Sequence, residues 1–375
     1  MALSKIDPAG LDIGQIGGRR NLIINGAMQV AQRGTSATGV TTPAYYSVDR
    51  MKFDIGSCGT HTVSQAADAP DGFATSYKIE VTTAEATPTT TDKLAMQYLF
   101  EGQDLQQLKY GTTSAQDIAL SFWVKTNKTG TYSNEVIQTD NSNRHYSFSY
   151  TVNSADTWEY KTLVISGDSI GLIDNDTGLG LVLKFWLDGG DSWTSGTYTA
   201  NQWQARTNAN VISSSSPHLA DTIGNYWQIT GVQLEVGTVA TPFEHRSYGE
   251  ELALCQRYYQ IIQEGAGSRD NSGSITVPGE YLIGVGFAYQ STRVMGHYRY
   301  IVPMRAIPTG AVSASSDIYC LATGGAWSAA SAVNLRLNDR SARLDINGVS
   351  LTAGHATEIQ INANTDGYLE FDAEL

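Results

Sequence analysis

The chain contains 375 residues, carries a formal net charge of −13 and is 41% hydrophobic. At roughly 150 residues per domain, this length predicts two or three domains, and the hydrophobic content excludes a disordered chain. The negative charge disfavours binding to nucleic acid or to an anionic membrane surface, because both would repel the protein. No apolar run approaches the roughly 18 residues that span a bilayer, and the first residues, MALSKIDPAG, lack a signal-peptide pattern. We therefore expect synthesis in a cytoplasm and no membrane insertion.

The cysteine and histidine residues are scattered. Cys58, Cys255 and Cys320 form no CxxC pair, and the six histidines form no HExxH motif. No GxSxG or GxGxxG signature stands out either. The sequence therefore predicts no disulfide framework, no transition-metal cofactor, no catalytic residues and no enzyme activity.

The first 20 residues have little apolar periodicity and predict an N-terminal arm. Short runs of alternating apolar and polar residues follow, and only residues 104–109 and 249–256 have a helical pattern. This density of short runs separated by turn residues predicts an all-β fold, built as an antiparallel sandwich or barrel. The strands expected before the second helical segment are residues 48–53, 60–65, 77–81, 94–100, 118–125, 145–152, 158–165, 179–187 and 227–236.

A change in composition marks a domain boundary near residue 249. Six of the seven tryptophans precede Tyr248, and only Trp327 follows it, which indicates two differently filled cores. We expect a first domain over residues 21–249 and a second, smaller β-sandwich over residues 250–375. Its expected strands are residues 257–263, 274–277, 281–289, 295–302, 318–322, 334–337, 342–346, 358–363 and 367–371.

Three long stretches carry a resemblance to a known family: GGRRNLIINGAMQVAQRG at residues 17–34, EGQDLQQLKYGTTSAQDIALSFWVKTNKTGTY at 101–132, and WQITGVQLEVGTVATPFEHRSYGEELALCQRYYQ at 227–260. Two short features add to it, the Asp49-Arg50 step after a Tyr-rich turn and PMRAIP at residues 303–308. They resemble bacteriophage virion proteins, namely tail fibres and related structural proteins of marine phages and cyanophages. The resemblance implies a jelly roll like that of carbohydrate-binding modules in the first domain, location on the virion, and assembly as a homotrimer. It also implies that the arm docks onto other tail or virion proteins, or that another virion protein supplies the attachment.

An aromatic-rich jelly roll offers a surface for host glycans, because a sugar ring stacks on an aromatic side chain while polar groups bind its hydroxyls. Residues 189–210 have this mixture, and Trp193, Tyr198 and Trp203 are the candidate glycan-binding residues. The same aromatics could instead cap the sandwich or fill a contact between protomers. Trp123, Trp186 and Trp227 lie inside expected strands and predict packing in a core or a contact.

A glycine-rich turn at residues 167–180 suggests a structural calcium ion. Asp168, Asp174 and Asp176 are the candidate ligands, since carboxylates at alternating positions of such a turn can hold Ca²⁺. The spacing is not that of an EF-hand, and the alternative is a solvated turn whose aspartates cap their own backbone.

Together these features predict a virion structural protein, namely a tail-fibre or receptor-binding subunit that binds host-surface glycans through several weak contacts. A purely structural capsid or tail adaptor without glycan binding, and a non-viral carbohydrate-binding module, are the alternatives. The acidic charge favours a neutral or weakly charged glycan, unless Arg293, Arg299 and Arg305 form a basic patch in the second domain. Tyr281, Tyr289, Tyr298, Tyr300 and Trp327 of that domain either fill its core or meet the host.

Overall fold

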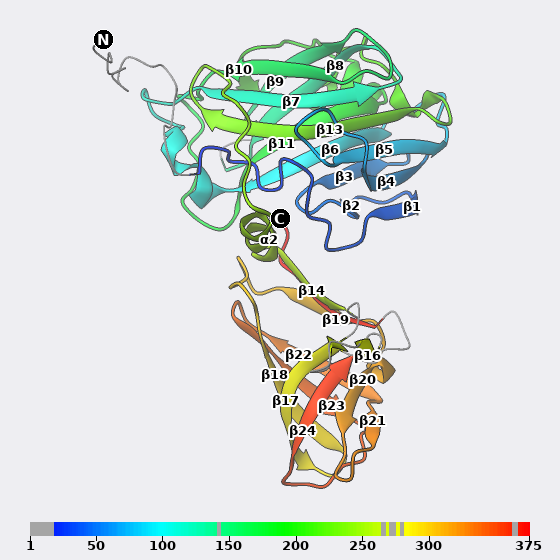
Figure 1. Cartoon of the computed structure of the whole chain (residues 1–375). Helices are drawn as coiled ribbons and strands as arrows, with labels where there is room; N and C mark the ends of the chain where they lie inside the picture. Colours follow the sequence, from blue (N-terminus) through cyan, green and yellow to red (C-terminus); the bar gives the residue numbers. More distant parts are fainter. Residues whose placement is uncertain (1–18, 141–143, 264–267, 270–274, 278–280, 362–366) are drawn as a thin grey trace, which may run out of the picture. The chain divides into compact units, whose positions relative to one another are not determined.

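The computed structural model describes residues 19–140, 144–263, 268–269, 275–277, 281–361 and 367–375 (Figure 1). The chain forms two compact units, Met1–Glu251 with Leu375, and Leu252–Glu374. Apart from Arg19 and Arg20, the predicted N-terminal arm lies outside the described residues. Within the described ranges, no helix is long and apolar enough to cross a membrane.

The first unit is a sandwich of two antiparallel sheets, which confirms the predicted all-β class (Figure 1). Sheet A has the strand order β1 (Ser36–Val40), β4 (Thr60–Ala66), β5 (Ser76–Thr83), β13 (Tyr226–Val236), β7 (Ile118–Thr126) and β10 (Glu159–Ile165). Sheet B has the order β12 (Trp203–Ala205), β9 (Arg144–Val152), β8 (Gly130–Gln138), β11 (Leu179–Gly189), β6 (Lys93–Glu101), β3 (Lys52–Gly56) and β2 (Ala44–Tyr45).

The core of this unit lies between the two sheets and is largely aromatic. The Phe122 ring of β7 meets the Phe185 ring of β11 edge to face, with centroids 5.1 Å apart. Trp227 of β13 is fully buried beside Phe185, and its indole N–H donates a 2.8 Å hydrogen bond to the Tyr150 hydroxyl. Trp227 therefore packs in the core, as the sequence predicts.

The two predicted helical segments are both present as short connectors. The first is the 3-10 helix η2 (Gly102–Leu108), which buries Leu105 and Leu108, and the second is α2 (Tyr248–Gln256). Three shorter helical turns, α1 (Asp191–Thr194), η3 (Asn208–Asn210) and η4 (Leu219–Asp221), interrupt the long connection from β11 to β13.

Residues 190–217 of that connection include the edge strand β12, and residues on both sides of it pack on the outer face of sheet B, where Trp193 contacts Trp186 of β11 and Arg206 contacts Glu135 of β8. Beneath them lies a polar row on the adjacent strands β6, β11, β8 and β9, in which half-buried Gln97 and the buried residues Lys184, Glu135 and Ser147 stand opposite one another. The covering segment supplies Arg206, whose guanidinium donates two hydrogen bonds of 3.0 and 2.9 Å to the two carboxylate oxygens of Glu135. Sheet B is thus buried on both faces along this row.

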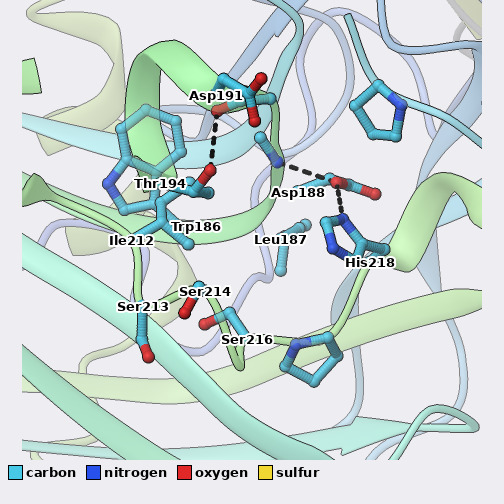
Figure 2. Close-up of a pocket in the computed structure, with 14 residues that line it drawn as sticks. Trp186, Leu187, Asp188, Asp191, Thr194, Ile212, Ser213, Ser214, Ser216 and His218 are labelled. Atoms are coloured by element: carbon cyan, nitrogen blue, oxygen red, sulfur yellow. Dashed lines mark hydrogen bonds and ion pairs between the residues drawn. The ribbon is translucent and has the colours of Figure 1, made fainter. Parts of the chain in front are cut away.

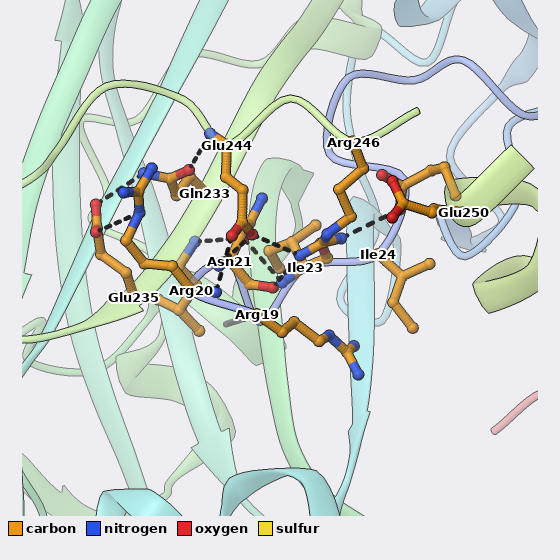
Figure 3. A network of polar contacts seen from close by, with 12 residues as sticks. Arg19, Arg20, Asn21, Ile23, Ile24, Gln233, Glu235, Glu244, Arg246 and Glu250 are labelled. Atoms are coloured by element: carbon orange, nitrogen blue, oxygen red, sulfur yellow. Dashed lines mark hydrogen bonds and ion pairs between the residues drawn. The ribbon is translucent and has the colours of Figure 1, made fainter. Parts of the chain in front are cut away.

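The segment at residues 19–28 runs beside β13 (Figure 3). It thereby links the N-terminal part of the first unit to residues 232–246 near the C-terminal end of that unit. Leu22 N–H donates to the Leu234 carbonyl at 2.8 Å, and Val232 N–H donates to the Gly26 carbonyl at 2.9 Å. Arg246 donates hydrogen bonds to the Asn21 carbonyl at 2.5 Å and to Glu244 at 2.9 Å. The stretches that carry the phage resemblance therefore include the parts that close this fold.

The second unit pairs a seven-stranded sheet with smaller ones (Figure 1). The large sheet has the order β21 (Trp327–Ala329), β20 (Ile318–Leu321), β24 (Ala356–Ile361), β17 (Tyr281–Gln290), β18 (Arg293–Arg299), β23 (Ser341–Asn347) and β22 (Ala332–Leu337). A three-stranded sheet, β14 (Tyr259–Gln263), β25 (Tyr368–Asp372) and β19 (Thr309–Val312), and a pair, β15 (Ser268–Arg269) with β16 (Ile275–Val277), complete it; η5 (Ser315–Asp317) precedes β20.

The core of the second unit is mainly aliphatic, with one cluster of aromatic rings. Tyr298 stacks on Phe371 of the three-stranded sheet at 5.6 Å, and Tyr300 meets the same ring at 4.8 Å. Tyr298 and Tyr300 are buried, whereas Tyr289 is exposed. The tyrosines of this unit therefore divide between its core and its surface.

Candidate functional site

An aromatic groove lies on the outer face of sheet A. It has a volume of about 450 Å³, and its ring-bearing walls are formed by Phe73, Trp123, Tyr160, Phe243 and His245. Trp123 of β7 and Tyr160 of β10 stand directly opposite each other, with ring centroids 5.2 Å apart, and Tyr160 is 45% exposed. The pair forms an accessible aromatic platform across two strands.

The alternation of β7 explains why Trp123 reaches this surface. Successive side chains of a strand point to opposite faces, so Phe122 and Trp123 cannot both enter the core. Phe122 is fully buried against Phe185, and Trp123 is only half-buried. Trp123 therefore lies outside the core, and the contact that the sequence allowed as its other role stays a prediction.

The other wall of the groove depends on a glycine in β13. The register of β13 against β7 shifts between Thr230 and Gln233, and Gly231 in this irregularity has a φ of +62°. A Cβ atom at Gly231 would lie 2.7 Å from the Phe73 ring. Phe73 in turn packs edge to face on Phe243 at 5.1 Å. Glycine at this position allows both the backbone conformation and the close approach of the ring.

Polar groups accompany these rings. Asp71, Ser121 and Thr241 also line the groove. The Thr241 hydroxyl donates a 2.7 Å hydrogen bond to Glu235, whose carboxylate also accepts the Thr241 N–H at 2.8 Å, so this wall is held in place. Exposed rings beside carboxylate and hydroxyl groups are the combination that binds the apolar face and the hydroxyls of a sugar.

A second, smaller pocket of about 160 Å³ lies where β11 ends (Figure 2). Its central feature is Asp188, whose side chain is fully buried and accepts hydrogen bonds from His218 Nδ1–H at 2.8 Å and from the N–H groups of Gly189 and Ala220 at 2.8 and 2.9 Å. The hydrogen bond to Asp188 raises the pKa of His218, and 48% of that side chain is exposed. Ser213, Ser214 and Ser216 contribute to the opposite wall. The pocket therefore presents an oriented imidazole and hydroxyl groups.

The sharp entry into α1 shapes this pocket. Gly190 follows the end of β11, and a Cβ atom there would lie 1.7 Å from the Thr89 carbonyl oxygen. Because only glycine fits so close to that carbonyl, the chain can turn directly from β11 into α1 and carry Asp191 and Thr194 into the pocket wall.

The structure places the three predicted glycan-binding aromatics in separate contacts with the chain itself. Trp193 of α1 packs on Trp186, with ring centroids 5.2 Å apart, and the Tyr198 hydroxyl donates to the Phe148 carbonyl at 2.7 Å. Trp203 of edge strand β12 donates its indole N–H to the Ser166 carbonyl at 2.6 Å. All three rings remain partly exposed. Trp186 itself is 2% exposed and donates to buried Glu135 at 3.1 Å, in agreement with its predicted packing role.

The three predicted calcium ligands do not converge. Asp168 is buried, and its carboxylate receives two hydrogen bonds of 2.7 and 3.1 Å from Arg144, while Asp174 and Asp176 are exposed. Asp176 accepts the Gly178 N–H at 2.8 Å, which is the capped-turn arrangement given above as the alternative. In the part of the chain that the structure describes, no group of three His, Cys, Asp or Glu side chains is placed to hold a metal ion.

Sequence reasoning missed the aromatic groove because its rings come from four separate stretches. Phe73 lies in a loop, Trp123 and Tyr160 lie on two strands, and Phe243 and His245 follow β13. The adjacent aromatics Phe122 and Trp123 are the one local signal, since one of them had to face outward. The pairing of β7 with β10 could not be read from the chain.

Comparison with known proteins finds no family model and no curated protein that matches this chain. Solved structures that match include the enzymatically active domain of tailspike protein 4 from bacteriophage CBA120, at 14% identity and a TM-score of 0.31; the match covers 58% of this chain and 21% of that chain. A family 22 carbohydrate-binding module from Clostridium thermocellum matches at 12% identity and a TM-score of 0.30, over 52% of this chain and 91% of that chain. A putative sugar-binding protein from Bacteroides thetaiotaomicron matches at 13% identity and a TM-score of 0.32, over 58% and 100%. These similarities are too low to assign a ligand or an activity.

Proposed function

We propose that this chain is a phage virion protein, a tail-fibre or receptor-binding subunit, and that its first unit binds host-surface glycans in the aromatic groove. The observation that carries the glycan part is the pair of half-buried Trp123 and exposed Tyr160 on paired strands. A sugar ring can stack on this platform while Asp71, Ser121 and Thr241 bind its hydroxyls. The virion part rests on the resemblance of the three stretches at residues 17–34, 101–132 and 227–260.

A groove with one aromatic platform gives a weak site, so we also propose that the protein acts as a homotrimer. Several copies of a weak site raise avidity by about 10² to 10⁴ without new contacts. Light scattering under native conditions should give about three times the chain mass of 40.5 kDa. A native mass equal to that of one chain would overturn the trimer and leave the glycan site to be judged separately.

The glycan site is tested with an array of neutral and acidic glycans probed with the whole protein. Trp123→Ala should weaken binding at least about tenfold, the equivalent of 1.4 kcal/mol, because the platform is lost. Tyr248→Ala is the matched control, since Tyr248 is 57% exposed and does not line the groove. Trp193→Ala tests the other aromatic candidate and should leave binding unchanged. Equal loss of glycan binding in the Trp123→Ala and Tyr248→Ala variants would show that the aromatic groove is not the glycan site.

A purely structural capsid or tail role is the second candidate. The contacts of Trp193, Tyr198 and Trp203 with the chain itself favour it, because these aromatics then serve packing. Mass spectrometry of purified particles separates the cases further: absence of the chain from particles would remove both virion roles, and presence without binding to any glycan would favour the structural one.

A further inference from the structure

A groove of about 610 Å³ on the large sheet of the second unit gathers arginines in an otherwise acidic chain. Three arginines, Arg293, Arg336 and Arg343, line it together with a single carboxylate, Asp345. Neutral polar residues and one ring complete the lining: Tyr289, Thr292, Asn334 and Asn347, with Gly348. The groove thus carries a formal charge of about +2 on a chain whose net charge is −13.

The strand register explains this gathering. Arg293 of β18 stands opposite Asn347 of β23, and Arg343 of β23 stands opposite Arg336 of β22. Since side chains two residues apart share one face of a strand, Arg343 and Asn347 lie on the same face of β23, with Asp345 between them. Residues distant in the sequence are thereby brought to one outer face of the sheet. Two arginines named in the sequence analysis, Arg293 and Arg299, belong to β18, and both are exposed.

Arg305 does not join them. Its Nε–H donates a 2.5 Å hydrogen bond to the Ala373 carbonyl, and it does not line the groove. The three arginines expected to crowd one stretch therefore separate, and the basic groove is completed by Arg336 and Arg343 instead.

Asp345 orients two of the guanidinium groups. Arg336 Nε–H donates to Asp345 Oδ2 at 2.9 Å, and Arg343 Nε–H donates to Oδ1 at 2.7 Å. Each guanidinium carries five N–H donors, so one carboxylate cannot saturate both groups. The Arg336 side chain is 71% exposed, and that of Arg343 is 35% exposed. The pair is held in a fixed direction and stays accessible to a further anion.

Exposed rings lie beside the arginines on the neighbouring strand. Phe287 and Tyr289 of β17 are 49% and 37% exposed, and Phe287 stands opposite Met295 of β18. A flat apolar strip thus adjoins a cationic groove on a single sheet face.

We propose that this face of the second unit binds an acidic polysaccharide, whose carboxylate or sulfate groups contact Arg293, Arg336 and Arg343. Guanidinium groups bind such oxyanions through paired hydrogen bonds, and the Tyr289 ring with the Asn334 and Asn347 amides suits the face and hydroxyls of a sugar ring. An extended acidic peptide would instead be expected to pair its backbone with an open strand edge. The groove crosses β18 and β23, which already have a neighbour on both sides, and reaches the edge strand β22 through Asn334 and Arg336. Recognition over β18 and β23 must therefore use side chains, and of these three strands β22 alone offers a backbone edge. This site is independent of the aromatic groove of the first unit.

The test measures binding of the whole protein to polygalacturonate, dextran sulfate and neutral dextran at two salt concentrations. We expect both anionic polymers to bind, neutral dextran not to bind through this site, and affinity to fall as salt rises. The double variant Arg293→Gln with Arg336→Gln should lose at least about tenfold in affinity for the anionic polymers, since charge-assisted hydrogen bonds are removed. Arg340→Gln is the matched control, because Arg340 is 76% exposed and does not line the groove.

The outcomes separate the two proposed sites. The proposal is supported if the double variant loses affinity for the anionic polymers and the Arg340→Gln variant keeps it. Trp123→Ala should not alter binding of the anionic polymers. No binding of either anionic polymer, or equal binding by the double variant, would overturn it. Tight binding of poly-L-glutamate without binding of the polysaccharides would also overturn it and would assign the face to an acidic protein partner. None of these results alters the glycan test of the aromatic groove.

Discussion

The backbone N–H of Asn21 donates a 2.9 Å hydrogen bond to the Oε2 atom of Glu244, which lies 223 residues further along the chain. The other carboxylate oxygen of Glu244 accepts the Arg20 N–H at 3.1 Å (Figure 3). Asn21 begins the NLIINGAM stretch and Glu244 lies in the PFEHR stretch, so these two phrases meet in space. The meeting of the two phrases closes the fold, and Phe243 and His245 of the second phrase also line the aromatic groove.

Glu244→Gln should therefore destabilise the first unit. Hydrogen bonds to a charged group contribute about 1.5 to 3 kcal/mol each, and the variant weakens those to two backbone N–H groups and to Arg246. We expect a loss of about 2 to 3 kcal/mol in unfolding free energy, measured by urea denaturation. Glu80→Gln is the control, because Glu80 is 40% exposed in its ion pair with Lys78, and its loss should stay within about 1 kcal/mol. Equal losses in both variants would contradict the role assigned to Glu244.

Gly26→Ala should disturb the same closure by another mechanism. A Cβ atom at Gly26 would lie 2.2 Å from the Val232 carbonyl oxygen, which also accepts a 3.0 Å hydrogen bond from the Asn21 side chain. The backbone must shift to relieve this overlap, so we expect a loss of about 1 to 3 kcal/mol. Gly249→Ala has no neighbour within 4 Å of its new Cβ and should be neutral or stabilising. Differential scanning calorimetry would compare the two, and an unchanged melting temperature for Gly26→Ala would count against the close packing.

The buried carboxylate of Glu135 predicts a stability loss in acid. Burial alone would raise the pKa of Glu135, but hydrogen bonds from His145 and Arg206 outweigh it and lower the pKa to about 2. Because the pKa in the folded state lies below the ordinary value of 4.5, the ionised Glu135 carboxylate stabilises the fold above pH 4.5, and this stabilisation is lost as the pH falls towards 2. The shift corresponds to about 3 kcal/mol.

Denaturation between pH 6 and pH 2.5, the lower limit set near that pKa, provides the measurement. Glu135→Gln should be less stable at neutral pH and should lose less stability over this acidic range than the natural protein. Glu80→Gln should lose as much unfolding free energy over this pH range as the natural protein does. If Glu135→Gln also lost as much as the natural protein, other carboxylates would be the cause of the acid sensitivity.

The hydrogen bond between His218 and Asp188, in the pocket at the end of β11, predicts how His218 titrates. The hydrogen bond to Asp188 raises the pKa of His218 above its ordinary value of 6.5, so the ring should stay protonated to higher pH than an exposed histidine. The stability that this pair contributes is present below pH 6.5 and is lost as the pH rises through the raised pKa. An NMR titration of the histidine ring protons should give His218 a pKa above the ordinary value of 6.5, and Asp188→Asn should lower that pKa. An unchanged value in that variant would refute the coupling.

The all-β architecture and the short helices η2 and α2 were predictable, because most strands have alternating apolar residues between turn residues and these two segments have a helical pattern. Strand β8 was not predicted, since its sequence GTYSNEVIQ is largely polar. The structure explains this: Glu135 of β8 faces a covered polar row, where His145 and Arg206 satisfy its carboxylate. A polar strand buried by a distant segment has no signature in the strand itself.

The candidate site was harder to predict than the fold. Aromatic content pointed to residues 189–210, but the sequence could not show that Trp193, Tyr198 and Trp203 would bind their own chain. The paired platform of Trp123 and Tyr160 depends on which strands become neighbours, and that is decided by long-range packing.

The cover that residues 190–217 form over sheet B restricts how copies of the first unit can associate. The chain already occupies that outer face, whereas the outer face of sheet A holds the accessible Trp123–Tyr160 platform. If copies joined through the face of sheet A, each new contact would hide a groove, and assembly would compete with ligand for the same side chains. A multimer that keeps its grooves available must therefore be joined through other surfaces, and adding ligand should not dissociate it.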